Sequence, residues 1–154
     1  QLPLAQVDSL RCEEVLDKPL PEMHIRASIT ALRYANKTGS RLFVPVAPLR
    51  SGPGRFTAER RHDLWIDKGY CDTDSLTLHL PEGYVVEALP KSVTIENRFG
   101  KIAFEALCSG DRLHIRIRLL RRSGRYPQSE YAAFREFMQA VDRVYSAKIV
   151  LRKV

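Results

Sequence analysis

Strand-length segments separated by turn sequences fill most of this chain and most constrain how it can fold. Between residues 60 and 120 the segments are RRHDLWI, SLTLHL, YVVEAL, SVTIEN, KIAFEALC and RLHIRIRLL, with Gly, Pro and Asp concentrated in the connections. Short strands with a turn every eight to twelve residues are typical of antiparallel sandwiches and barrels. The sequence therefore predicts a mainly β fold, an antiparallel two-sheet β-sandwich of about eight or nine strands.

Two segments outside that run support the same interpretation. In HIRASITAL (24–32), apolar and polar residues alternate, which predicts a strand with one buried face. In LPEGYVVEALP (80–90), a proline stands near each end and Gly83 precedes the apolar centre. Proline removes a backbone donor and glycine relieves a tight turn, so this stretch is predicted to be a short strand of the scaffold rather than a binding loop.

The hydrophobic period changes near the C-terminus. From 128 to 144, aromatic and aliphatic residues recur at steps of three and four, which predicts an amphipathic helix of about four turns. Pro127 suits the first position of a helix, and Glu130 places a negative charge in the first turn. The segment AKIVLRKV then predicts a last strand over about 147–152.

The net charge of +7 is concentrated in two arginine-rich clusters, 55–61 and 112–125. Within 112–119, strand alternation places Leu and Ile on one face and Arg and His on the other. Glu105, on the expected partner strand, could face one of these arginines and neutralise part of the stripe. A basic surface also attracts anionic partners through long-range electrostatics.

These clusters define a candidate interaction surface. It consists of Trp65, Tyr70, Arg116, Arg118, Arg121 and Arg122. Aromatic and basic side chains together can bind an anionic glycan, and the same mixture can stack bases and neutralise phosphates. Because no nucleic-acid-binding module motif accompanies them, nucleic acid is not the favoured partner.

No constellation of residues predicts a cofactor, a metal ion or a nucleotide. The four histidines are isolated, Cys12, Cys71 and Cys108 form no C-x-x-C pair, and no glycine-rich phosphate loop is present. The DTD triplet at 72–74 lacks the rest of a calcium loop and is better explained as a turn. Cys108 ends an apolar run, which favours a buried, inert thiol.

Nucleophilic catalysis has one set of candidates. A hydrolase would use Cys71 with His62 or His79 as base and Asp72 or Asp74 as the orienting group. No spacing ties Cys71 to either histidine, so the sequence predicts no catalytic residue in this chain.

The length of 154 residues suits a single domain, 1–154, in which residues 1–6 are expected to be a linker from a preceding domain. The chain begins without Met and without a charged segment followed by an apolar one, so we expect a piece of a longer protein with no signal peptide of its own. No apolar run approaches the roughly 18 residues of a membrane span.

Several motifs, in order, resemble one known family. They are KTGSRLFVPVAPL (37–49), the run 67–93 that begins DKGYCDTDSLTLHL, the FGKIAFEA hairpin (99–106), and GRYPQSEYAAFREFMQAV (124–141) followed by AKIVLRK. Together they are similar to the C-terminal domain of unknown function that follows the transglutaminase-like core in multi-domain bacterial exported proteins.

This resemblance implies a noncatalytic, β-sandwich accessory domain that packs against and supports the neighbouring transglutaminase-like, papain-like domain. It places the catalytic Cys, His and Asp in that core, outside this chain, and implies a periplasmic, cell-envelope or extracellular location. The alternative is a binding module that holds an anionic glycan or another polyanion through the Arg-rich strand face.

Overall fold

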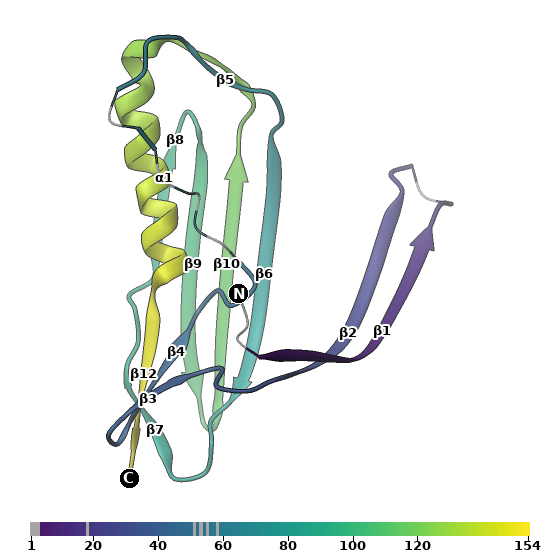
Figure 1. The fold of residues 1–154 in the computed structure, drawn as a ribbon, viewed down its shortest axis with the longest axis vertical. Coiled ribbons are helices and arrows are strands. Elements are labelled where there is room, and N and C mark those ends of the chain that lie inside the picture. The colour runs from purple at the N-terminus through teal and green to yellow at the C-terminus, as the bar shows by residue number, and fades with distance from the viewer. Residues whose placement is uncertain (1–3, 18, 51, 53, 55, 58) are drawn as a thin grey trace. The chain divides into compact units, whose positions relative to one another are not determined.

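The computed structural model describes residues 4–17, 19–50, 52, 54, 56–57 and 59–154 (Figure 1). Its contacts divide the chain into two units, Gln1–Tyr34 and Ala35–Val154. Strands dominate both units, which confirms the mainly β prediction. A single domain over 1–154 stays a prediction.

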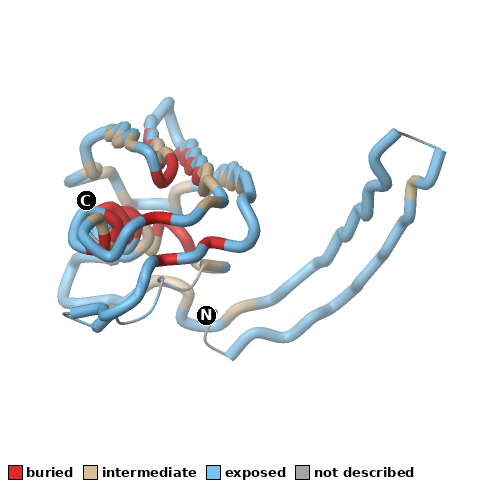
Figure 2. Tube along the Cα trace, turned by 90° about the horizontal axis from the view of Figure 1, so that it is seen from above, coloured by how far each residue is buried: buried red, intermediate tan, exposed pale blue. Residues whose placement is uncertain are grey.

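The first unit is an antiparallel hairpin of β1 (Ala5–Val15) and β2 (Glu22–Ala31). Residues 1–3 of the predicted linker lie outside the described residues, whereas Ala5 and Gln6 already pair with β2. The strand predicted in 24–32 is therefore confirmed. Its predicted burial is wrong, because nearly every residue of both strands is exposed (Figure 2).

The largest sheet of the second unit has the order β6-β10-β9-β8. Its strands are β6 (Tyr70–His79), β8 (Val93–Asn97), β9 (Gly100–Ser109) and β10 (Arg112–Arg121). β10 lies inside the sheet, paired along its whole length with both neighbours. Its Leu and Ile residues at 113, 115, 117 and 119 are 1–3% exposed, which confirms the predicted division of the strand into two faces.

Helix α1 (Tyr131–Ser146) follows a short turn of 3-10 helix, η1 (Gln128–Glu130), and lies over one side of this sheet (Figure 1). Phe134 meets Phe99 edge to face, with ring centroids 5.5 Å apart. Gly100 permits the close approach of Leu120 and Phe137, because a Cβ there would lie 2.1 Å from the Leu120 carbonyl oxygen and 3.1 Å from the Phe137 ring. Among the described helices, none has the length and apolar character needed to cross a membrane.

A second four-stranded sheet has the order β3-β4-β12-β7. Its strands are β3 (Asn36–Thr38), β4 (Arg41–Pro45), β7 (Tyr84–Ala88) and β12 (Lys148–Lys153). The C-terminal strand therefore lies between two strands from much earlier in the chain, and its Ile149 is completely buried. Gly83, at a φ of +73°, makes the turn into β7 that the sequence predicted.

The short strands β5 (Leu64–Ile66) and β11 (Gly124–Tyr126) pair as a fourth sheet. The described chain thus has 12 strands in four antiparallel sheets, compared with the predicted two sheets and eight or nine strands. Strands of three residues carry too little alternation to be recognised in a sequence. The C-terminal helix and last strand are confirmed within two or three residues.

Replacing Ile117 tests the importance of the inward face. We expect Ile117→Ala to lower the free energy of unfolding by about 2–5 kcal/mol, because it removes buried methyl groups and leaves a cavity in the core. Ser75→Ala, on the outward face of β6, is the control and should change it by no more than about 0.5 kcal/mol. Urea denaturation followed by circular dichroism measures both, and equal values for the two variants would contradict this account of the core.

Candidate functional site

The outward face of the large sheet carries a row of exposed basic side chains along β10. They are Arg112, His114, Arg116 and Arg118. In the strand register, Arg116 lies between Ser75 of β6 and Glu105 of β9. Glu105 is therefore opposite an arginine, as the alternation predicted, and it offsets part of the positive charge.

A hollow of about 190 Å³ opens on this face, lined by Ala103, Glu105, Arg116 and Arg118. Ala103 carries only a methyl group, which leaves space between its longer neighbours. Interaction with Cys71, at the start of β6, raises the pKa of the Arg118 guanidinium. Two cationic groups that present several N–H donors can bind an anionic group such as a sulfate or a carboxylate.

The other two arginines of the predicted surface are used within the fold. By strand alternation, Arg121 lies on the same side of β10 as the buried Leu and Ile residues. Its guanidinium lies 5.8 Å from the Phe134 ring centroid and 5.9 Å from that of Tyr70. Arg122 donates hydrogen bonds to the Asn97 carbonyl oxygen and, at 2.9 Å, to the Glu96 carboxylate. The predicted surface is therefore divided, because only Arg116 and Arg118 lie together on the outward face.

Trp65 is exposed elsewhere on the second unit. It stands in β5 between the buried Leu64 and Ile66, so strand alternation directs its indole outward, where 74% of the residue is exposed. A hollow of about 420 Å³ lies beside it, lined by His62, Asp63, Trp65 and Arg125. Asp63 accepts a hydrogen bond from Arg125 Nε at 3.2 Å, which fixes this guanidinium near the indole.

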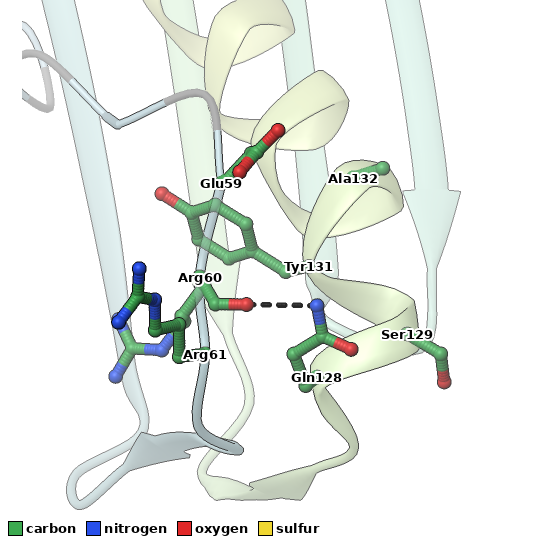
Figure 3. A pocket seen from close by; sticks show the side chains of 7 residues that line it. All are labelled: Glu59, Arg60, Arg61, Gln128, Ser129, Tyr131 and Ala132. Carbon is green, nitrogen blue, oxygen red and sulfur yellow. Dashed lines mark hydrogen bonds between the residues drawn. The ribbon is translucent and has the colours of Figure 1, made fainter.

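A larger pocket of about 640 Å³ is formed by the same part of the chain (Figure 3). Its lining consists of Glu59, Arg60, Arg61, Gln128, Ser129, Tyr131 and Ala132. Gln128 Nε2 donates to the Arg60 carbonyl oxygen at 2.7 Å, and the Arg60 guanidinium lies 5.7 Å from the Tyr131 ring centroid. The sequence indicated the basic cluster 55–61, of which residues 55 and 58 lie outside the described residues, but could not indicate that Arg60 and Arg61 meet the start of the helix.

The aspartates of the DTD triplet bind an arginine. Arg50 donates to both carboxylate oxygens of Asp74 at 2.8 Å and to Asp72 at 2.7 Å. This ion pair lies near Tyr145 of α1, where burial raises the pKa of the phenol to about 12 against an opposing effect of Arg50. The two carboxylates thus join the loop after β4 to the edge strand β6.

The structure does not bring together the candidate catalytic pair Cys71 and His79. Cys71 and His79 lie near opposite ends of β6, roughly 26 Å apart at the usual rise of a strand, so they cannot share a hydrogen bond. Across the described residues, no group of three or more His, Cys, Asp or Glu could hold a metal ion. The prediction that Cys108 is buried is wrong, because it lies next to the β9–β10 turn and is exposed.

Comparison with known proteins identifies the family. The family DUF3858, described as a domain of unknown function with a solved structure, matches residues 40–151. The chain belongs to this family. The matched region lies within the second unit, and the hairpin of β1 and β2 precedes it.

A solved structure shares the fold. It is the crystal structure, at 2.00 Å resolution, of a protein from Parabacteroides distasonis described as a "putative protease". The superposition has a TM-score of 0.59 at 12% identity and covers 71% of this chain but only 23% of the other. This chain thus spans less than a quarter of the protein it resembles. None of the curated proteins matches it.

Titration of Tyr145 tests the environment of the Arg50 ion pair. We expect the tyrosinate absorbance that Tyr145→Phe removes to develop near pH 12, above the ordinary tyrosine pKa of 10.0, because burial favours the neutral phenol. Because the pKa of Tyr145 is higher in the folded state than in the unfolded state, the neutral phenol favours folding. This contribution to the free energy of unfolding is complete below pH 10 and is lost as the pH rises toward 12. If the absorbance that Tyr145→Phe removes instead develops near pH 10, Tyr145 is not buried in this way.

Proposed function

We propose that this member of the DUF3858 family is a noncatalytic accessory domain that packs against a transglutaminase-like domain of the same longer protein and stabilises it. The observation that carries the proposal is the exposure of Trp65. A tryptophan that is 74% exposed on a short, well-anchored strand presents a large apolar surface to water. Tryptophan and arginine are the residues most enriched at the energetic centres of protein interfaces.

The surroundings of Trp65 suit a domain interface. The adjacent hollow of about 420 Å³ can receive a side chain from the partner, and Arg125 can bind a carboxylate at its rim. The chain spans 23% of the similar solved protein, so this fold occurs there within a much longer polypeptide. The ordered motifs from 37 to 153 support a transglutaminase-like neighbour, and with it a periplasmic, envelope or extracellular location.

A binding experiment in trans tests the accessory role. The neighbouring core and residues 1–154 are produced separately, and their association is measured by calorimetry together with the thermal midpoint of the core. We expect residues 1–154 to raise the midpoint, and Trp65→Ala to weaken association by about 30-fold or more, the effect of losing about 2 kcal/mol at a hot spot.

Leu107→Ala is the matched control. Leu107 is also a large exposed residue, at 67%, but it lies on β9 in the large sheet. This variant should bind as the parent sequence does. Failure of the unsubstituted chain to bind or stabilise the core would refute the accessory role, and equal affinities of the two variants would refute the assignment to Trp65.

The outward face of the large sheet favours a second candidate function, binding of an anionic glycan. Arg116 and Arg118 line a hollow of about 190 Å³, and Ser75 and Thr73 stand opposite them in register. Paired guanidinium groups bind sulfates and carboxylates, while neighbouring hydroxyl groups can hydrogen-bond to a sugar.

Salt dependence on a heparin column tests this second function. We expect the double variant Arg116→Gln, Arg118→Gln to elute earlier and to lower the slope of log affinity against log salt by about two, because two ionic contacts are lost. Lys37→Gln with Lys91→Gln is the charge-matched control and should retain the parental slope. Identical elution of the two double variants would show that the hollow is not the binding site.

A further inference from the structure

The two faces of the β1–β2 hairpin differ in the side chains that they carry. Opposite residues in an antiparallel pair point to the same side, so the register defines each face. One side carries Ala5, Val7, Leu10, Cys12, Met23, Ile25, Ala27, Ile29 and Ala31, with Glu14 at its end. We call this set the apolar ribbon face. Its large members are 42–64% exposed.

A β-bulge preserves this face. The apolar residues Val7 and Leu10 of β1 are three positions apart, a spacing that would place them on opposite sides of a regular strand. The register shifts between Val7 and Ser9, which adds one residue and returns Leu10 to the side of Val7. Asp8, the additional residue, accepts a hydrogen bond from Thr30 Oγ1 at 2.7 Å. The bulge in the hairpin thus keeps its apolar residues on one face.

The opposite face is polar except for Val15, which pairs with Glu22 at its end. It carries Gln6, Ser9, Arg11, Glu13, Glu22, His24, Arg26, Ser28 and Thr30. On this face, His24 Nε2 lies 3.0 Å from Glu22 Oε2. A face of this composition is stable in water, whereas a continuous apolar face of this length is typical of an interaction site.

We propose that the apolar ribbon face packs on an apolar surface of another folded domain of the same polypeptide, which rests on the proposed function as an accessory domain. The size of the face supports a tethered partner. Two strands of about ten residues, at about 3.3 Å per residue and about 4.8 Å between strands, present on the order of 300 Å². A standard interface between separate proteins covers about 800 Å² per partner. A face this small needs the high effective concentration of a covalent link.

The position of the hairpin in the chain supports the same partner. The hairpin precedes the family match at 40–151, and the contacts of the chain separate it from the second unit after Tyr34. An isolated two-stranded hairpin is at best marginally stable in water, so the hairpin needs a covering surface to stay folded. The apolar ribbon face carries no charge except Glu14, so the covering surface must itself be apolar.

Hydrogen exchange tests the proposal in two preparations, residues 1–154 alone and the longer polypeptide that also contains the transglutaminase-like core. We expect the amides of β1 and β2 to exchange rapidly in the short chain and at least 10-fold more slowly in the longer one. Ala27→Lys in the longer polypeptide should abolish that protection, because it places a charge in the centre of the face opposite Leu10.

Ser28→Lys is the matched control. Ser28 is adjacent, small and exposed, but it belongs to the polar face, so this variant should retain the protection. Equal loss in both variants would overturn the proposal. Slow exchange of the hairpin in residues 1–154 alone would also overturn the proposal. Such protection would point to the second unit if it did not depend on concentration, to a second copy if it did, and to a membrane surface if lipid vesicles induced it.

The result is separable from the accessory role. If the hairpin is protected in the longer polypeptide while the core is no more stable with residues 1–154 than without them, the docking inference stands and the accessory function fails. If residues 1–154 stabilise the core but the hairpin exchanges rapidly in both preparations, the accessory function stands and the docking inference is refuted.

Discussion

Burial of apolar side chains between α1 and the inward face of the large sheet holds the second unit together. Ile117 at the centre of β10 and Phe134 on the helix are both almost completely buried, and Phe99 contacts Phe134 from the sheet side. A sheet covered by a helix on one side leaves its other face polar and exposed. The outward position of Arg116 and Arg118 is therefore a direct consequence of how this core is built.

The same alternation exposes Trp65. Its neighbours Leu64 and Ile66 are anchored in the interior, and a strand directs successive side chains to opposite sides. The indole consequently faces solvent beside Arg125 and His62. An indole that is 74% exposed on a strand whose neighbouring residues are buried is suited to binding a surface.

Similar patterns have different outcomes in the two units. Alternation along β10 yields one buried and one exposed face, because its apolar side lies in the core of the second unit. Alternation along β2 yields two exposed faces, and Ile25 is 61% exposed. The bulge near Asp8 shows that the hairpin is organised around its apolar side despite this exposure. A hydrophobic pattern thus indicates that a face is made for burial, whereas the covering surface must come from elsewhere.

The sequence alone determined the mainly β class, the C-terminal helix, the last strand and the two faces of β10, because each depends on periodicity over neighbouring residues. Tertiary structure decided what depends on distant partners: Arg121 lies against the rings of Tyr70 and Phe134, and Arg122 binds residues at the end of β8. It also exposed Cys108, which has an apolar sequence context but stands beside a turn. Periodicity assigns a side of a strand, but only the packed neighbours decide whether that side meets protein or water.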